Sequence, residues 1–373
     1  MKNIVIISLL LLSLSACSSN KKEECPVLKV SLEKENVSIM DLFDRLEVIA
    51  LETNDSCLLI WPDKILYTKG CYEIFDAKHP ALFVFDENGR FVRKVGAKGE
   101  GPEEYTEVYD VTSDDQNGNI YMLSPFGEIF VYTPDGNFIE RRRLPQKSNY
   151  QSLESFGDYF AIWTLPGAED EDGISLVAKS TLSNVKEYWR GNRELYSLYP
   201  RAFHKYEGNL YFFRPFDREV YNVCKDSMSI AYTWDFGKDN YSVEDLGFSK
   251  TASTEREEGT LLLKYLKDRT IPYLISAQNQ TSRYYYSQLV FGFTPQGIHH
   301  VFYSKEDGKS FFFKETVEGI RLNPLLFNDD FILCLASNAE LDSYKKALNE
   351  TERKKLINRK EEDNPVLIKC YYK

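Results

Sequence analysis

The chain has 373 residues, of which 43% are hydrophobic and 14% are aromatic, and its formal net charge is −11. Such an acidic chain lacks the positive surface with which proteins bind nucleic acid or an anionic membrane surface. The aromatic residues are mainly 25 Tyr and 24 Phe, residue types that favour β-strands. The composition therefore indicates a mainly β protein and excludes nucleic acid as a partner.

The first residues have the pattern of an export signal. Lys2 is followed by an apolar segment, 4–14, which is too short to cross the ~30 Å hydrocarbon core of a bilayer. The segment ends in Leu-Ser-Ala-Cys, which resembles a bacterial lipobox, and the cysteine that would carry the lipid is Cys17. We therefore expect residues 1–16 to be a lipoprotein signal peptide; an ordinary signal peptide with a chance cysteine is the alternative.

The remaining chain divides into a short polar tether and one long domain. We expect residues 17–26 to be the lipid-anchored tether and residues 27–373 to form a single domain held at the membrane by its lipid. A domain of this length does not depend on disulfides. Cys334 and Cys370 lie in apolar, strand-like segments, where a buried free thiol is expected. We predict no disulfide framework.

Two pairs of segments reveal an internal repeat. Residues 81–92 (ALFVFDENGRFV) align with 128–139 (EIFVYTPDGNFI) at an offset of 47 residues, and each reads as two apolar runs around a turn that ends in Gly. Residues 118–126 (GNIYMLSPF) align with 208–216 (GNLYFFRPF) at an offset of 90. The second offset is close to twice the first, which gives a period of about 45 residues.

A period of this length with several short strands per unit is typical of a β-propeller. The predicted fold is all-β: a six-bladed propeller with two helical insertions, in 242–274 and 339–363. A propeller ring must be closed, because a first and a last blade otherwise leave open strand edges. We expect the strand at 366–372 to share a blade with an N-terminal strand, at 26–32 or 45–51. A β-sandwich is the alternative fold, but it does not explain both offsets.

The glycine-rich segment 96–105 (GAKGEGPEEY) raises the question of a phosphate site. No Lys-Ser or Lys-Thr follows the glycines, and Pro102 removes one backbone N–H donor. Three glutamates in the segment would repel a phosphate. The segment is therefore predicted to be a connection between strands.

The same segment carries a resemblance to a known family. The pattern consists of Phe85, Asp86, Gly89, Phe91, Gly96, Gly99, Gly101, Pro102, Glu104 and Tyr105. It resembles the signature of six-bladed β-propeller lipoproteins of Bacteroidota and, more loosely, NHL-repeat propellers. The resemblance implies that the loop links the outer strand of one blade to the inner strand of the next, with Tyr105 packed between blades. It also implies a cell-envelope protein, which we expect at the outer membrane, and it implies no particular activity.

Motifs for catalysis or for metal binding are missing from the sequence. There are four histidines, and the only adjacent pair, His299-His300, points to opposite faces if it lies in a strand. Segments that resemble calcium loops lack essential ligands, and there is no G-x-S-x-G nucleophile elbow. We predict no metal site and no cofactor, and the catalytic residues of any enzyme activity stay unknown.

Aromatic side chains are the best candidates for ligand contact. Propellers bind ligands at the mouth of the ring, where aromatic rings can stack on sugars. The candidates are Trp163, Trp189, Trp234 and Tyr285, together with its neighbours Tyr284 and Tyr286; packing between blades is the alternative for each.

Three functional hypotheses remain open. The first is an envelope binding module for a glycan, a peptide or a partner protein, with no recognisable catalytic motif. The second is a propeller hydrolase or lyase that acts on sugars or lactones. The third is a structural or sensory subunit with no small ligand.

Overall fold

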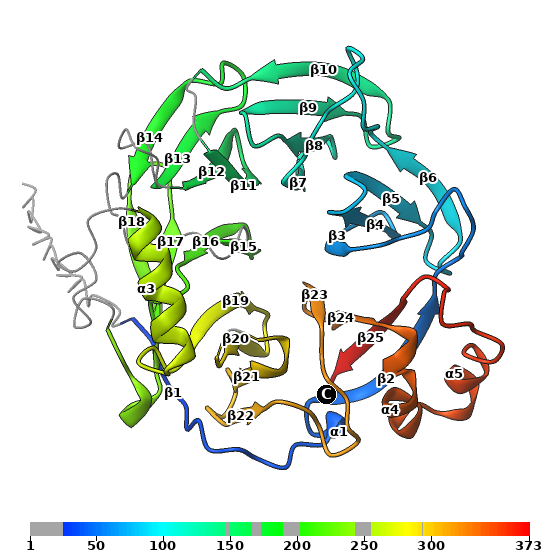
Figure 1. Cartoon of the computed structure of the whole chain (residues 1–373), viewed down its shortest axis with the longest axis vertical. Coiled ribbons are helices and arrows are strands. Elements are labelled where there is room, and N and C mark those ends of the chain that lie inside the picture. The colour runs from blue at the N-terminus through cyan, green and yellow to red at the C-terminus, as the bar shows by residue number, and fades with distance from the viewer. Residues whose placement is uncertain (1–24, 146–148, 166–172, 189–201, 243–254, 293) are drawn as a thin grey trace, which may run out of the picture.

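The fold is a closed ring of six β-sheets, as predicted (Figure 1). The computed structural model describes residues 25–373 except 146–148, 166–172, 189–201, 243–254 and 293. Neighbouring strands within each blade are antiparallel, and the innermost strand of each blade lies closest to the ring axis.

The blades follow one another along the chain. Blade 1 contains β3 (Pro62–Thr68), β4 (Cys71–Asp76), β5 (Ala81–Phe85) and β6 (Phe91–Val95). Blade 2 contains β7 (Asp110–Ser113), β8 (Ile120–Leu123), β9 (Glu128–Tyr132) and β10 (Phe138–Arg143). Blade 3 contains β11 (Asn149–Phe156), β12 (Tyr159–Leu165), β13 (Gly173–Ala178) and β14 (Asn184–Tyr188). Blade 4 contains β15 (Phe203–Tyr206), β16 (Asn209–Phe213), β17 (Glu219–Val223) and β18 (Met228–Asp235). Blade 5 contains β19 (Leu274–Gln280), β20 (Tyr284–Val290), β21 (Ile298–Ser304) and β22 (Ser310–Phe313).

Blade 6 closes the ring by combining both ends of the chain. It contains β23 (Pro324–Phe327), β24 (Phe331–Ala336), β25 (Val366–Tyr372) and, as its outer strand, β2 (Phe43–Ala50). Of the two N-terminal segments predicted to pair with the last strand, the second is the correct one. The first, as β1 (Val27–Lys29), instead adds a parallel outer strand to β18 of blade 4.

The repeat offsets correspond to blade spacing. The segments offset by 47 residues form the hairpins β5–β6 and β9–β10 of blades 1 and 2. The segments offset by 90 contain β8 and β16, the second strands of blades 2 and 4. Glycine is required in the turns: Gly89 and Gly136 have φ values of +81° and +87°, a conformation that other residues rarely adopt.

The core is divided among the interfaces between blades. Six clusters of buried hydrophobic side chains lie one between each pair of neighbouring blades. Both faces of a blade are therefore apolar, which explains why the strands are mostly continuous apolar runs. Removal of this surface from water is the main stabilising contribution to the ring.

Helices occur in the two predicted insertions. The first contains α3 (Glu255–Lys267), which packs on blades 4 and 5 through Leu261, Tyr265 and Leu266. A short 3-10 helix, η1 (Gly237–Asp239), precedes the predicted insertion. The second contains η4 (Asn338–Glu340), α4 (Leu341–Ala347) and α5 (Glu350–Lys354). Its residues at helical spacing, Leu341, Tyr344, Leu348 and Leu356, are buried against blades 5 and 6.

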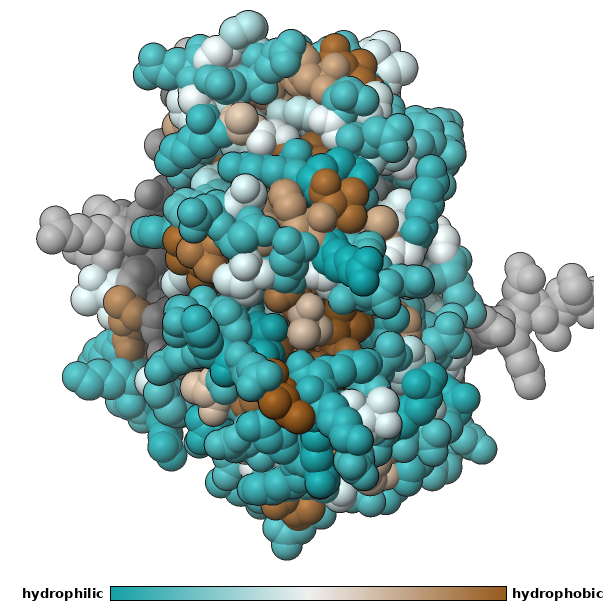
Figure 2. Space-filling model, turned by 90° about the vertical axis from the view of Figure 1, so that its right-hand side faces the viewer, coloured by the Kyte–Doolittle hydropathy of each residue, from teal (hydrophilic) through white to brown (hydrophobic). Residues whose placement is uncertain are grey.

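The N-terminal segment follows the outside of the ring from β1 to α1 (Ile39–Leu42), past blade 5 (Figure 1). Along this path the backbone N–H of Glu35 donates to the carbonyl oxygen of Phe312 in β22. The flank of the ring that carries β6 and β2 is mainly hydrophilic, with small and separate hydrophobic areas (Figure 2). No helix among the described residues is long and apolar enough to cross a membrane.

Candidate binding site on the connection face

The two ends of the ring differ in the length of their loops. At one end, which we call the connection face, each blade is joined to the next and the second strand of each blade is joined to the third. The connections there include 51–61, 96–109, 236–273 and 337–365, with both helical insertions. At the other end, the turn face, the described turns have two to six residues. Long connections on a rigid scaffold are where binding sites are commonly formed.

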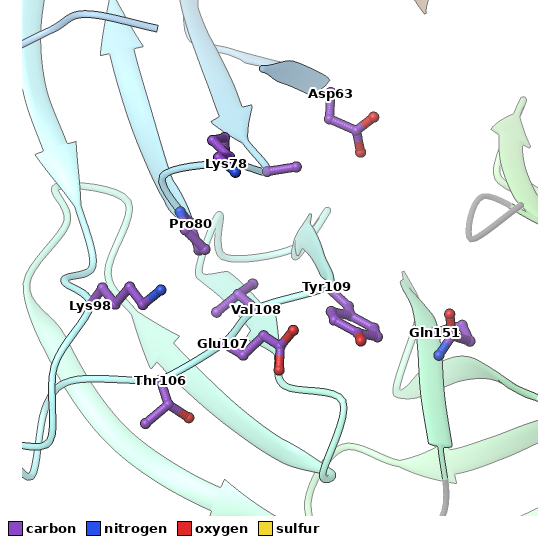
Figure 3. Close-up of a pocket in the computed structure, with 10 residues that line it drawn as sticks. Asp63, Lys78, Pro80, Lys98, Thr106, Glu107, Val108, Tyr109 and Gln151 are labelled. Carbon is purple, nitrogen blue, oxygen red and sulfur yellow. The ribbon is translucent and has the colours of Figure 1, made fainter. Parts of the chain in front are cut away.

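A pocket of about 700 Å³ opens on the connection face where blades 1, 2 and 3 meet (Figure 3). It is lined by Asp63, Ala77, Lys78, Pro80, Lys98, Thr106, Glu107, Val108, Tyr109 and Gln151. Most of these residues come from the β4–β5 turn and from the connection between β6 and β7. Asp63 and Gln151 lie near the beginnings of the inner strands β3 and β11. The volume is within the range that holds a small organic ligand.

Asp76, at the end of β4, fixes one wall of this pocket. Its side chain is fully buried. One carboxylate oxygen accepts the backbone N–H groups of Lys78 and His79 at 3.0 and 2.8 Å. The other accepts those of Ile60 and Trp61 at 2.5 and 2.8 Å. The carboxylate therefore holds the β4–β5 turn and the preceding connection in one arrangement.

Three exposed aromatic side chains lie at or beside the pocket. Trp61 is 65% exposed, Phe126 is 59% exposed and Tyr109 is 37% exposed. The carbonyl oxygen of Trp61 accepts the N–H of the pocket residue Ala77 at 2.9 Å. Phe126 lies in the β8–β9 turn. The carbonyl oxygen of Pro125, the residue before it, accepts the backbone N–H of Tyr150, the residue before Gln151. Tyr109 therefore lines the pocket, whereas Trp61 and Phe126 belong to segments whose backbones are bonded to residues at or next to the lining.

The polar groups of the pocket carry charges of both signs, with Lys78 and Lys98 facing the same space as Asp63 and Glu107 (Figure 3). Burial, the adjacent Glu107 carboxylate and a hydrogen bond between the two side chains raise the pKa of Tyr109. Tyr109 is therefore a neutral hydrogen-bonding group at physiological pH.

A buried network of charges lies near the ring axis behind the pocket. Lys64 Nζ is 2.9 Å from Asp110 and 3.5 Å from Glu154, and Lys205 Nζ is 3.2 Å from Glu154. Thr112 donates a hydrogen bond of 2.5 Å to Glu154. Burial alone would raise the pKa of Glu154, but the two lysines and this hydrogen bond hold it below its usual range. Each charge has a partner, so the network connects the inner strands of blades 1 to 4 rigidly.

The glycine-rich loop is a connection between blades 1 and 2. Tyr105 is 2% exposed, and its hydroxyl donates to the carbonyl oxygen of Pro80 at 2.5 Å. A Cβ on Gly96 would lie 2.6 Å from that hydroxyl, and a Cβ on Gly99 would lie 1.9 Å from Glu104 Oε2. Only Gly96 of these glycines has a positive φ; at Gly99 the requirement is space for the carboxylate.

The remaining signature positions shape the same turn. The Glu104 carboxylate accepts the backbone N–H of Gly101 at 2.9 Å, and Pro102 is exposed between the two residues. The loop leads directly into Thr106 and Glu107, so it positions one side of the pocket.

The aromatic residues predicted to stack on a ligand lie elsewhere. Trp163 and Trp234 are 3% and 0% exposed and pack between blades, so neither offers a face to a ligand. Tyr286 is also buried, whereas Tyr284 and Tyr285 are half-buried in blade 5. Trp189 and Cys17 lie outside the described residues.

The residues that were not predicted from the sequence are Trp61, Asp63, Asp76, Glu107, Tyr109 and Phe126. Two of the aromatic residues share a position, because Trp61 and Tyr109 stand immediately before the inner strands β3 and β7. Aromatic rings in strands pack between blades, whereas those in connections can stay exposed.

Metal binding has no candidate in the described part of the chain, which contains no group of three His, Cys, Asp or Glu side chains that could hold an ion. His299 and His300 do point to opposite sides of blade 5. His299 stacks on Phe312, and His300 Nδ1 is 2.9 Å from the Tyr286 hydroxyl.

The fold and the pocket together define a six-bladed β-propeller with a potential ligand site on its connection face. The sequence profile of a domain of unknown function, DUF4934, matches residues 25–371, and the chain belongs to this family. None of the curated proteins matches the chain.

Two crystal structures share the fold. An exported protein from Bacteroides fragilis NCTC 9343 is 20% identical, with a TM-score of 0.76 over 93% of this chain and 99% of the other. A member of the DUF4221 family from Bacteroides vulgatus is 9% identical, with a TM-score of 0.54 over 88% and 97% of the two chains. At these identities the likeness concerns the fold alone.

Proposed function

We propose that the chain is a binding module of the cell envelope and that the pocket on its connection face receives a glycan. The observation that carries the proposal is the combination of exposed aromatic rings with carboxylate, amide and ammonium groups around one pocket. Aromatic faces are suited to the C–H faces of a sugar ring. A ligand rich in hydroxyl groups, which both donate and accept hydrogen bonds, can use Asp63, Glu107, Gln151 and Lys98 together.

A peptide or a partner protein is a less favoured occupant of the same site. The pocket is concave, and most of the side chains that line it are polar or charged. Large protein interfaces are usually broader and more continuous.

A second candidate function is that of a hydrolase or lyase that acts on sugars. The observation in its favour is that Asp63 and Glu107 line one pocket, since two carboxylates are the usual machinery of glycoside hydrolysis. Turnover of a bound glycan would identify an enzyme, and binding without turnover would identify a binding module.

We further propose that the protein is exported and anchored by lipid at Cys17, at the outer membrane. Support comes from the apolar segment and lipobox in the sequence, and from the exported protein with the same fold. A Cys17→Ala variant is expected to move from the membrane fraction to the soluble fraction and to lose incorporation of labelled fatty acid. Retention of both by the variant would refute lipidation at this residue.

Binding is tested with residues 25–373, which contain every described element of the ring. Thermal unfolding is measured against a panel of glycans and peptidoglycan fragments, because a ligand that binds only the folded state raises the midpoint. The Trp61→Ala variant is then expected to bind the selected glycan about fivefold more weakly, since a stacking contact contributes about 1 kcal/mol. Ile139→Ala is the matched control, because this side chain is 46% exposed on the outer strand β10. Equal affinities for the two variants would contradict the proposed site.

A further inference from the structure

The interface between blades 4 and 5 contains buried polar side chains that lack partners. They include both ring nitrogens of His204, the hydroxyl of Tyr232, the amide nitrogen of Gln278 and the hydroxyl of Ser287. All four side chains are at most 5% exposed. A buried polar group without a partner costs about 1–3 kcal/mol, so a set of them in one interface suggests an occupant.

Strand pairing places these groups on facing sides of the interface. In blade 5, Gln278 is directly opposite Ser287 on the neighbouring strand. In blade 4, His204 stacks on its cross-strand partner Tyr211 at 5.0 Å. Tyr232 of blade 4 contacts Tyr285 of blade 5, with ring centroids 4.6 Å apart.

A lysine closes the turn-face end of this interface. Lys305 Nζ donates to Gln280 Oε1 at 3.0 Å and lies 4.3 and 4.4 Å from the ring centroids of Tyr206 and Tyr285. None of the ion pairs among the described residues includes Lys305. Burial lowers its pKa to about 8, although the more distant carboxylates of Glu207 and Asp329 act in the opposite direction. The positive charge of Lys305 is therefore poorly compensated.

Hydrogen-bond donors predominate in the cluster. The side-chain oxygen of Gln278 already accepts the Trp234 Nε1–H at 2.9 Å, and that of Gln280 accepts Lys305. The amide nitrogen of Gln278 can only donate, and the ammonium group has further N–H groups to donate. Burial, followed by the charge of Lys305, lowers the pKa of His204 to about 3, so its ring is neutral and donates one N–H.

We propose that this cluster, formed by His204, Tyr232, Gln278, Ser287 and Lys305, is a second binding site and that it takes a small monovalent anion such as chloride. An anion can accept hydrogen bonds from the N–H and O–H groups of the cluster and supplies the charge that Lys305 lacks. A water molecule leaves the ammonium charge uncompensated. The site is separate from the pocket on the connection face, and the inference is independent of glycan binding.

The experiment compares unfolding midpoints of residues 25–373 in sodium chloride and in sodium gluconate of equal ionic strength, since gluconate is too large for a buried site. Chloride is expected to raise the midpoint of the unsubstituted chain. Lys305→Met should abolish the rise. Lys309→Met is the matched control, because Lys309 lies on the same turn with its ammonium 4.4 Å from the Phe311 ring and should leave the rise unchanged.

A second variant separates anion binding from any loss of packing. Gln280→Glu places a carboxylate beside Lys305, so this variant should fold and unfold normally but show no chloride response. Crystals soaked in bromide should give an anomalous peak within hydrogen-bonding distance of Lys305 Nζ. Equal chloride responses of the unsubstituted chain and Lys305→Met, or water alone in the bromide-soaked crystal, would overturn the proposal.

Discussion

Replacement of Asp76 by Asn tests how the wall of the connection-face pocket is held. Both carboxylate oxygens of Asp76 are used, each by two backbone N–H groups, and the side chain is fully buried. In Asp76→Asn one oxygen becomes an NH₂ group that faces two N–H donors. Two charge-assisted hydrogen bonds are lost at about 1.5 kcal/mol each, so the free energy of unfolding should fall by about 3 kcal/mol.

Asp86→Asn provides the matched control on the turn face. A single oxygen of Asp86 accepts both the Asn88 and the Arg90 backbone N–H groups, at 2.8 and 2.9 Å. An asparagine oxygen can accept the same two bonds, so the cost should stay below about 0.5 kcal/mol. Urea unfolding of both variants measures the difference. If the two substitutions lower the free energy of unfolding by amounts that agree within about 0.5 kcal/mol, the reasoning is refuted. The second carboxylate oxygen of Asp76 would then contribute no more to stability than that of Asp86.

Three further substitutions probe the glycine-rich loop and the buried charges, each measured by urea unfolding. Gly99→Ala should lower the free energy of unfolding by about 1.5 kcal/mol, because its Cβ displaces the Glu104 carboxylate from the backbone N–H that it accepts. In a Glu104→Ala background the same substitution should cost almost nothing, and additive costs would contradict this coupling. Tyr105→Phe should cost about 1–3 kcal/mol, because a buried backbone carbonyl loses its partner, and an unchanged midpoint would argue against that bond. Glu154→Gln should cost about 3 kcal/mol at neutral pH. Because the folded-state pKa of Glu154 is lowered, its contribution is complete above the unfolded pKa of about 4.3 and is lost as the pH falls further, so the cost of the substitution should shrink in acid. A cost that does not change with pH would be inconsistent with this assignment.

The ring could be predicted because similar sequences recur in the second, third and fourth strands of the blades. The paired segments at offsets of 47 and 90 residues correspond to blades one and two positions apart. Closure of the ring by pairing of the two chain ends was predictable, since an open ring leaves unpaired strand edges. The pairing of β2 with β25 confirms it. The added strand β1 was not predictable, because a short apolar run can extend any free outer edge with suitable side chains.

The pocket on the connection face was harder to predict because it depends on contacts between different connections. Trp163 and Trp234 were candidates for stacking on a ligand, and both lie in strands. Strand side chains in a propeller face the neighbouring blade and become buried. The backbone N–H of Trp61 is held by Asp76, which lies opposite Pro62 on the neighbouring strand β4. Such an arrangement follows from the geometry of the loops, which has no periodic pattern in the sequence.

Glycan binding at the pocket is tested most directly by a crystal structure of residues 25–373 with the glycan selected by thermal unfolding. We predict a sugar ring in the pocket between Trp61 and Tyr109, with its hydroxyl groups bonded to Asp63, Glu107 or Gln151. A glycan bound at the turn face, or outside this pocket elsewhere on the ring, would contradict the central claim.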